Sequence, residues 1–406
     1  MGKARVIIIG TDPGAERYVS FALRHPHMLS IAGIASADTK RRDYIAAKCS
    51  IPSHCRFSSW EEILERPCFA DAAVIAAGSG AGDPAVAALE CGYRLRIEHP
   101  EALDEAHCRS ILHLSGKNGI HISAFNPLFA DQAVSRALDI IGGGELGDVS
   151  TASYEEHISL RTLSFIVREG VNAADCRVAE ACRGFSLLSR FIGSEPASVS
   201  SFEGESASDT ANAPYSRAER CGICPSRDRC RFDSERLHIR RRLSQFDGDI
   251  TYSSHESDSR RSELRRKIKR GALGRCIFDA EQRIHDCLSH VAFRDSRTAR
   301  FQRITGLDHD GRLVRISAAE GSVEIIPGAA IIIRRRHEAE KIIHSVPSFA
   351  LQRKLTDDDT GRFADSIAGT VPLCTPEEAL RGRLRSLAAE RSRRERHAAP
   401  LPIQGD

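Results

Sequence analysis

The chain has 406 residues, of which 41% are hydrophobic and 28% are charged, as is usual for a folded globular protein rather than a disordered or fibrous one. Its formal net charge of +3 gives no reason to expect a nucleic acid as partner. No apolar run approaches the roughly 18 to 20 residues of a membrane-spanning helix, and no secretory leader is visible. We therefore expect a cytoplasmic protein without a membrane or nucleic-acid partner, and its length favours two domains.

Short apolar runs alternate with helical stretches in the first third of the chain. Strands are predicted at residues 5–10, 31–35, 72–76, 94–97 and 120–124. A capping box, Ser59-Trp-Glu-Glu62, predicts the start of one intervening helix. This alternation is typical of a doubly wound parallel sheet, so we expect a Rossmann α/β domain over residues 1–124.

The pattern changes to longer strands after residue 124. Strands are predicted at residues 149–158, 197–202, 287–294, 299–304, 313–318 and 323–333, which indicates an open, mainly antiparallel sheet in an α/β domain over residues 125–398. Within it, residues 203–235 form a polar insert that carries cysteines, and residues 399–406 are expected to be a tail.

A closing helix is predicted from Thr375 as cap, Pro376 and Glu378. Leu380 and Leu384 belong to its apolar stripe, and its arginines are expected on a solvated face.

The turn after the first strand has the position of a phosphate-binding turn. It reads Gly10, Thr11, Asp12, Pro13, Gly14, Ala15, and a helical pattern follows it. Gly10 would supply the tight turn and Ala15 is an accepted third position, but Asp12 stands where a second glycine would let the backbone approach a pyrophosphate.

The second predicted strand ends at Ser36, where an acidic residue would hold the ribose of NAD. Lys40, Arg41 and Arg42 follow. We therefore expect Ser36 and Arg41 to meet the adenosine ribose or its phosphate, with NADP slightly preferred over NAD. The alternative is that these cations only begin a solvated helix.

Several segments, spread over nearly the whole chain, resemble the Gfo/Idh/MocA oxidoreductases. Glu98-His99-Pro100 resembles the "EKP" segment of that family, Gly144-Glu-Leu-Gly-Asp-Val149 its "SGELGxV" and Phe191-Ile-Gly-Ser-Glu-Pro196 its "LLGSEP". Pro376-Glu-Glu-Ala-Leu-Arg381 resembles its closing helix, and Ala218-Glu-Arg-Cys221 resembles a branch with a cysteine insert. The resemblance implies a Rossmann domain and a C-terminal α/β domain whose open sheet covers the substrate cleft and through which homo-oligomers are expected. It also implies NAD(P)-linked chemistry on a sugar, cyclitol or related hydroxyl compound.

The catalytic positions of the family are altered in this chain. His99 replaces the family lysine, and Ala179 and Arg183 occupy the positions of its acid and histidine. Since His99 can exchange a proton near neutral pH, it is the candidate acid/base, with Glu98 fixing the turn. The alternative is a catalytically inactive relative that binds a ligand or a partner.

Three cysteines of the insert have the spacing C-x2-C-x5-C. Cys221, Cys224 and Cys230, with Cys276 as a fourth thiol, suit a structural zinc ion or an iron–sulfur cluster. Plain reduced thiols are the alternative, and Cys287, His285 and His238 compete for the fourth position. The remaining isolated cysteines are expected to be small buried hydrophobes: Cys49, Cys55, Cys68, Cys91, Cys108, Cys176, Cys182 and Cys374.

Overall fold

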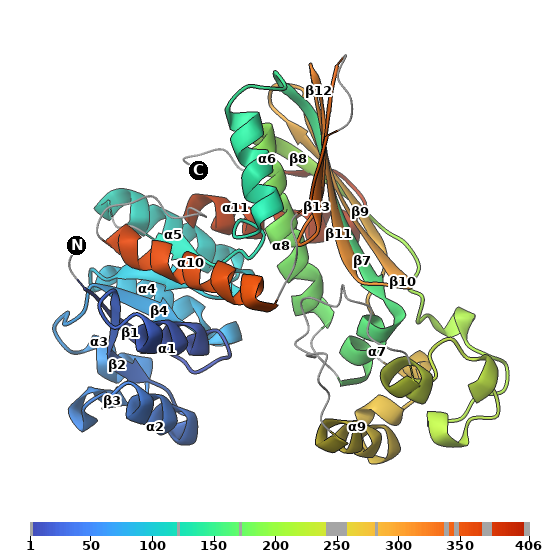
Figure 1. The fold of residues 1–406 in the computed structure, drawn as a ribbon, viewed down its shortest axis with the longest axis horizontal. Helices are drawn as coiled ribbons and strands as arrows, with labels where there is room; N and C mark the ends of the chain where they lie inside the picture. Colours follow the sequence, from blue (N-terminus) through green and yellow to red (C-terminus); the bar gives the residue numbers. More distant parts are fainter. Residues whose placement is uncertain are drawn as a thin grey trace. The chain divides into compact units, whose positions relative to one another are not determined.

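The computed structural model describes residues 3–119, 122–169, 173–240, 258–280, 283–336, 341–344, 349–367 and 376–401 (Figure 1). Packing divides the chain into two units. The first unit comprises Met1–Arg136, Phe185–Arg190 and Val346–Leu387, and the second comprises Ala137–Gly184, Phe191–Ser345 and Ala388–Asp406. The units are therefore not contiguous in sequence, unlike the division after Ala124 that the sequence indicated. No described helix is long and apolar enough to cross a membrane.

A parallel sheet forms the centre of the first unit. In the described part of the chain its strand order is β3-β2-β1-β4-β5-β6. The strands are β1 (Ala4–Ile9), β2 (Leu29–Ala35), β3 (Arg56–Phe57), β4 (Ala72–Ile75), β5 (Arg94–Ile97) and β6 (Ile122–Ala124). The predicted strands and the doubly wound sheet are thus confirmed, apart from the short β3. The order reverses between β1 and β4, where such sheets bind ligands.

The described helices of the first unit are α1 (Ala15–Arg24), α2 (Thr39–Lys48), α3 (Trp60–Leu64), α4 (Gly82–Glu90), α5 (Glu105–Asn118) and α10 (Phe349–Ile367). Three of them, α2, α3 and α5, begin at side-chain caps that the sequence provides. Asp38 caps α2, Asp104 caps α5 and Ser59 caps α3. The carboxylate of Glu62 accepts from the backbone N–H of Ser58 at 2.9 Å, so the predicted capping box closes one residue earlier than its usual form.

Helix α10 joins the first unit although it lies far along the sequence. Phe363 and Ala364 are buried in the same core as β1, β2 and α1, and the ring of Phe363 meets that of Tyr18 edge-on at 5.9 Å. Because α10 completes this core, the first unit needs a segment that the contiguous division had placed in the other domain.

A mixed, mainly antiparallel sheet forms the centre of the second unit, as predicted. The described strands have the order β14-β13-β12-β11-β7-β10-β9-β8-β15, and only β7 and β10 among these neighbours run parallel. They are β7 (Val149–Ser159), β8 (Pro196–Glu203), β9 (Cys287–Phe293), β10 (Thr298–Leu307), β11 (Gly311–Ala318), β12 (Gly321–Ile326), β13 (Ala330–Arg335), β14 (Lys341–His344) and β15 (Ala399–Pro400).

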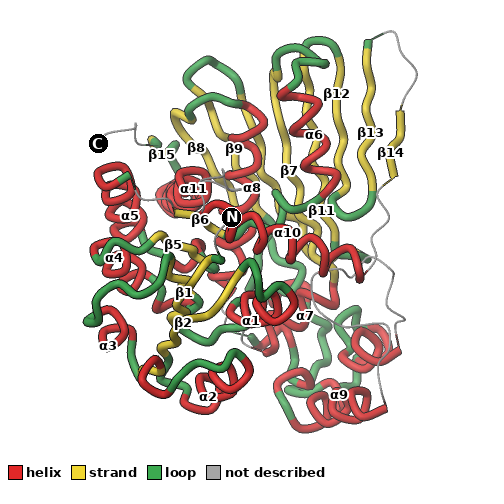
Figure 2. Tube along the Cα trace, turned by 60° about the vertical axis from the view of Figure 1, so that its left-hand side comes forward, coloured by secondary structure: helices red, strands yellow, loops and turns green. Residues whose placement is uncertain are grey.

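Helices cover one face of this sheet. Figure 2 shows α6 (Gln132–Gly142) and α8 (Ala173–Ile192) in front of the strands. Gly184 permits the close approach, since a Cβ there would lie 2.8 Å from the Phe301 ring. The unit also contains α7 (Leu160–Glu169) and α9 (Asp258–Arg270), while α11 (Pro376–Glu395) contributes to both units.

Two predicted boundaries of the second sheet were wrong. The single run expected at residues 323–333 is a hairpin, because Pro327 cannot donate to a ladder and Gly328 adopts a φ of +76°. The expected tail at residues 399–406 begins instead with β15, where Ala399 is fully buried and pairs with Val199.

The arginines of α11 are not all solvated. Arg383 and Arg385 are buried; Nε of Arg383 donates to the Leu103 carbonyl at 2.6 Å, and Nη1 of Arg385 donates to Ser189 Oγ at 2.6 Å. The expectation of a wholly solvated arginine face was wrong because these guanidiniums bond polar groups inside the first unit. The expected cap, Thr375, lies outside the described residues.

Candidate functional site

The residues predicted to hold a dinucleotide come together at one edge of the first sheet. Gly10 follows β1, Ser36 follows β2 and Glu98 follows β5; β1 and β5 flank β4, and β2 pairs with β1, all in parallel. The carboxyl ends of parallel strands meet at the same edge, next to the reversal between β1 and β4. The sequence therefore assembles its candidate residues where this fold class binds nucleotides.

Two glycines of the β1–α1 turn are required by close approach. Gly10 has a φ of +93°, and a Cβ there would lie 2.0 Å from the Ala76 carbonyl oxygen. At Gly14 a Cβ would lie 2.8 Å from Oε2 of Glu98. Ala15, the first residue of α1, is fully buried. The turn is thus tight enough to present the N-terminus of α1 to an anion, as a phosphate-binding turn must.

Asp12 and Thr11 connect this turn to neighbouring loops. The Asp12 carboxylate lies beside Gly78, where a Cβ would lie 2.8 Å from its Oδ2, and the Asp12 N–H donates to the Ala76 carbonyl at 3.1 Å. The Thr11 hydroxyl is 3.0 Å from the Ser36 hydroxyl. These contacts connect the ends of β1, β2 and β4.

A cation beside Ser36 is Arg42, and the predicted Arg41 lies next to it at the start of α2. Nη1 of Arg42 lies 3.4 Å from the carbonyl oxygens of Ser36 and Phe57, whereas Arg41 is exposed at the start of α2. Helical spacing explains why the two arginines point in different directions. Asp38 caps α2 by accepting from the Arg41 N–H, and Arg42, one residue later in the helix, points back toward β2.

Glu98 is the centre of a buried polar network. Its side chain accepts from the Tyr18 hydroxyl, from Arg17 and, at 3.4 Å, from Nε of Arg96. The Tyr18 hydroxyl itself accepts from Nε of Arg96 at 2.8 Å. Glu98 is 1% exposed, so two guanidiniums and a hydroxyl compensate a carboxylate that has left water.

The same network extends to α10. Arg96 also pairs with Asp359, and it donates to the Ser123 hydroxyl at 3.2 Å. Burial raises the pKa of the Tyr18 hydroxyl despite the neighbouring Arg96 and Arg17. Although burial disfavours the charged Arg96, Asp359 and Tyr18 raise its pKa above the ordinary value, so it remains a cation. Glu98 thus supports the turn from behind.

His99 lies at the rim of this edge. Its imidazole is 34% exposed, and Nδ1 is 3.4 Å from Oε1 of Glu101. Among the described residues Nε2 meets no hydrogen-bonding group, so that nitrogen is available to a bound molecule. The carboxylate favours a proton on Nδ1 and leaves Nε2 as the accepting atom.

The α8 positions that match the family's acid and histidine hold no base. Ala179 has no titratable group, and Arg183 bonds the adjacent Glu180 at 3.4 Å. Glu180 also accepts from Tyr154 and, at 2.7 Å, from Arg312. Burial alone would raise the pKa of Glu180, but Arg312 and Arg183 hold it far below the ordinary range. This buried carboxylate therefore stays ionised and joins α8 to the sheet.

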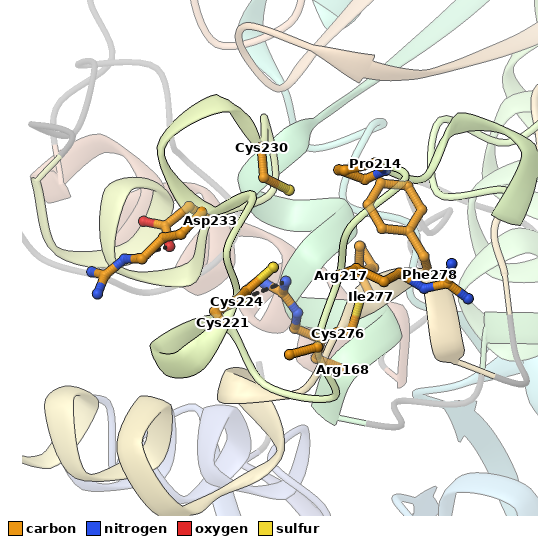
Figure 3. A pocket seen from close by; sticks show the side chains of 12 residues that line it. Arg168, Pro214, Arg217, Cys221, Cys224, Cys230, Asp233, Cys276, Ile277 and Phe278 are labelled. Atoms are coloured by element: carbon orange, nitrogen blue, oxygen red, sulfur yellow. Dashed lines mark hydrogen bonds and ion pairs between the residues drawn. The ribbon is translucent and has the colours of Figure 1, made fainter.

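The four cysteines named for a metal line one pocket of the second unit. Cys221, Cys224, Cys230 and Cys276 surround it together with Arg168 (Figure 3). Within the described residues no three or more His, Cys, Asp and Glu side chains are already arranged as a metal-ligand set. The four thiols named from the sequence thus share a pocket. That they bind a metal ion remains a prediction.

The isolated cysteines are not uniformly buried. Cys108 and Cys182 are buried as expected, and burial raises the pKa of Cys108 to about 12. Cys68 and Cys91 are exposed, so the expectation was wrong for them: Cys68 lies in an irregular segment and Cys91 in a turn after α4. Cys374 and the side chain of Cys176 lie outside the described residues.

Sequence reasoning missed Arg17, Tyr18 and Arg96 as parts of the site. Tyr18 and Arg17 could have been identified from their position in the first turn of the helix that follows the glycine turn, because that turn lies at the same edge of the sheet as Glu98. Asp359 offered no such signal, since it lies 263 residues from Arg96.

Residues 4–124 match the Gfo/Idh/MocA family model, described as "Oxidoreductase family, NAD-binding Rossmann fold". No curated protein matches the chain. Among solved structures, scyllo-inositol dehydrogenase from Lactobacillus casei with bound NAD(H) and scyllo-inositol is 12% identical, with a TM-score of 0.65 over 98% of this chain and 99% of that one.

Two further solved structures have the same fold over their whole length. Myo-inositol 2-dehydrogenase from Lactobacillus plantarum is 11% identical, with a TM-score of 0.63 over 98% of this chain and 100% of that one. An oxidoreductase from Agrobacterium radiobacter in complex with NAD+, L-tartaric acid and magnesium is 10% identical, with a TM-score of 0.64 over 98% of each chain. The resemblance and the fold class predicted from the sequence are confirmed.

Proposed function

We propose that this chain, which has the Gfo/Idh/MocA fold and an NAD-binding Rossmann unit, is an NAD(P)-dependent oxidoreductase of a sugar, cyclitol or related hydroxyl or keto compound. The observation that carries the proposal is the glycine turn at the strand-order reversal, with Ser36 and His99 at the same edge of the sheet. The inositol substrates of the similar solved structures agree with a polyhydroxylated ring as ligand.

The residues of the turn fit a dinucleotide. Gly10, Thr11, Gly14 and Ala15 would hold the pyrophosphate at the N-terminus of α1. The carboxylate of Asp12 lies beside Gly78 of the neighbouring loop, away from the backbone of the turn. A bound nicotinamide would supply hydride transfer; the protein's own task is to orient the reactants and move a proton.

His99 would perform the proton transfer. Oxidation of an alcohol requires a group that takes the hydroxyl proton, and Nε2 of His99 is an accessible acceptor whose ring is oriented by Glu101. Glu98 would act indirectly, by supporting Gly14 and hence the turn. Reduction of a keto compound would use the same imidazole as proton donor.

We also propose that NADP is preferred over NAD. Ser36 carries no charge that would repel a 2′-phosphate, and Arg42 lies beside it, with Lys40 and Arg41 on the exposed start of α2. Guanidinium groups suit phosphate recognition, so these cations favour the phosphorylated ribose.

A catalytically inactive relative is the second candidate function. The observation that favours it is the α8 helix, in which Glu180 is occupied by three partners and Ala179 is inert. If His99 does not suffice, the scaffold would bind NAD(P) or another ligand without turnover.

Two further properties complete the proposal. The described cysteines are free thiols, which favours the reducing cytoplasm. Homo-oligomerisation through the second sheet would use the face opposite Tyr154 and Phe301, where Glu155 pairs with Arg300 and Arg315 at 2.9 Å each. Light scattering of the purified chain tests the assembly; a monomer would contradict it.

The experiment combines turnover with a matched pair of histidine variants. A panel of cyclitols and sugars is assayed with NADP and NAD at the absorbance band of reduced nicotinamide. We expect turnover by the unmodified chain and a loss of about 100-fold in kcat for His99→Gln, whereas His113→Gln, on the exposed side of α5, keeps its rate. Full activity of His99→Gln would remove His99 from the mechanism. Cofactor binding without turnover would favour the inactive relative.

A further inference from the structure

The four pocket cysteines each flank a tight turn. Cys221 begins and Cys224 ends the 3-10 turn Cys221–Ile223, and the Cys224 N–H donates to the Cys221 carbonyl at 3.3 Å. Cys230 follows the turn Arg227–Arg229, and Cys276 precedes the turn Ile277–Asp279. Paired thiols on short turns are a common framework of structural zinc sites.

Backbone pairing brings the fourth cysteine to the other three. Arg220 and Arg275 form an antiparallel bridge, and the Cys276 N–H donates to the Glu219 carbonyl at 2.7 Å. Cys221 and Cys276 each lie one residue beyond this bridge. Arg220 fixes the same junction by donating to the Gly271 carbonyl at 2.9 Å. The nonlocal fourth thiol is therefore held at the pocket by the backbone.

A buried cation faces these thiols without a carboxylate partner. Arg168 of α7 is 7% exposed; its Nη2 donates to the Phe232 carbonyl at 2.9 Å and to Cys221 Sγ at 3.4 Å. Its Nε is buried with no hydrogen-bond partner. No described carboxylate forms an ion pair with it, and Asp233, which also lines the pocket, pairs with Arg227 at 3.1 Å. Burying a guanidinium requires compensation by negative charge.

We propose that Cys221, Cys224, Cys230 and Cys276 bind one Zn²⁺ as four thiolates, and that Arg168 compensates the resulting charge. Four thiols release four protons on binding the dication, so the centre carries a charge of −2, and no redox step is involved. The four thiols line one pocket, and each flanks a short turn.

The ion would tie together the turns that lie beside an apolar core of the second unit. Phe232 and Phe278 meet edge-on at 5.5 Å, and with Ile277 they supply the buried apolar residues next to the thiols. A closed set of four thiolates leaves no coordination position for a substrate, so the site is structural and independent of the proposed hydride chemistry.

The test is metal analysis of the full chain, purified without chelators. We expect zinc in an equimolar amount, and loss of most of it in Cys221→Ser and in Cys276→Ser. Cys91→Ser, at an exposed thiol of the first unit, is the control and keeps its zinc. If these variants fail to fold, the absorption spectrum of the unmodified chain with Co²⁺ exchanged for its metal provides the test. Charge-transfer bands from thiolate to Co²⁺ support the proposal, and their absence contradicts it. Chain that folds and contains no metal, or iron with acid-labile sulfide, overturns it.

The role of Arg168 has its own test. Arg168→Gln should weaken zinc affinity about 10- to 100-fold in competition with a chelator, as removal of a supporting group around a metal does. Arg168→Lys should recover part of that loss, and Arg229→Gln, on the exposed side of the same insert, should leave the affinity unchanged. Equal affinities for all these variants would contradict the compensation by Arg168.

Discussion

The carboxylate of Glu98 lies directly against Gly14: a Cβ at residue 14 would lie 2.8 Å from Oε2. The residue that follows β5 thus determines which side chain the β1–α1 turn can hold. Glu98 is itself fixed by Tyr18, Arg17 and Arg96, so the turn rests on a buried, charged support.

Gly14→Ala should disturb both the turn and cofactor binding. The added methyl group must displace Glu98 or the turn, so we expect a loss of about 1–3 kcal/mol in the free energy of unfolding and a weaker affinity for NAD(P). Urea denaturation and calorimetry measure the two effects. Gly116→Ala is the matched control: nothing lies near its Cβ in α5, so it should stabilise by up to about 1 kcal/mol. Equal effects of the two substitutions would show that the turn tolerates a side chain.

Glu98→Gln should destabilise the first unit without changing its shape. The amide leaves Arg17 and Arg96 without their shared anion, and breaking a buried ion pair costs about 3 kcal/mol or more. Chemical denaturation checks this, with Glu65→Gln at an exposed position expected to change stability by less than about 0.5 kcal/mol. An unchanged midpoint for Glu98→Gln would mean that the network contributes little.

Arg42→Gln should lower the affinity for NADP more than that for NAD. If Arg42 contacts the 2′-phosphate, we expect a loss of about 10-fold for NADP, as is usual for a charge-assisted hydrogen bond, with little change for NAD. Arg41→Gln, at the exposed neighbouring position, should have the smaller effect. Parallel losses for the two cofactors in Arg42→Gln would contradict the proposed preference.

His107 should titrate above its usual range. Burial lowers the pKa of its imidazole, but Asp83 at 3.1 Å and Asp104 at 2.8 Å raise it by more, so the net shift is upward. The protonated ring therefore stabilises the fold below the unfolded-state pKa of about 6.5, and that contribution disappears as pH rises through the folded-state pKa. NMR titration of the ring measures the shift. Asp83→Asn should bring the pKa down; a pKa unaffected by that variant would exclude Asp83 as its cause.

Local patterns were sufficient to predict the central strands and the nucleotide turn. The run Val6-Ile-Ile-Ile9 followed by Gly10 specifies a buried parallel strand and a tight turn, and the structure has both. Ser36 could be named because it follows a predicted strand, which fixes the edge of the sheet where it lies, whereas His99 was named from the resemblance of Glu98-His99-Pro100 to the family's "EKP" segment.

Nonlocal pairing limited the rest of the prediction. Arg96 is buried because Asp359 of α10 compensates it, and nothing within a short window around Arg96 reveals that partner. Arg383 similarly looked like a solvated residue of α11, because the Leu103 carbonyl that accepts its hydrogen bond lies 280 residues away. The pairing of Arg220 with Arg275, which brings Cys276 to the pocket, had no local signal either.

Isothermal titration of the purified chain with NADP and with NAD tests the central claim most directly. Binding to a single site with micromolar affinity, tighter for NADP and weakened by Gly14→Ala but not by Gly116→Ala, is the result that we predict. Absence of heat for both cofactors up to millimolar concentration, from chain shown to be folded, would contradict the assignment of the β1–α1 turn as a dinucleotide site and with it the proposed oxidoreductase.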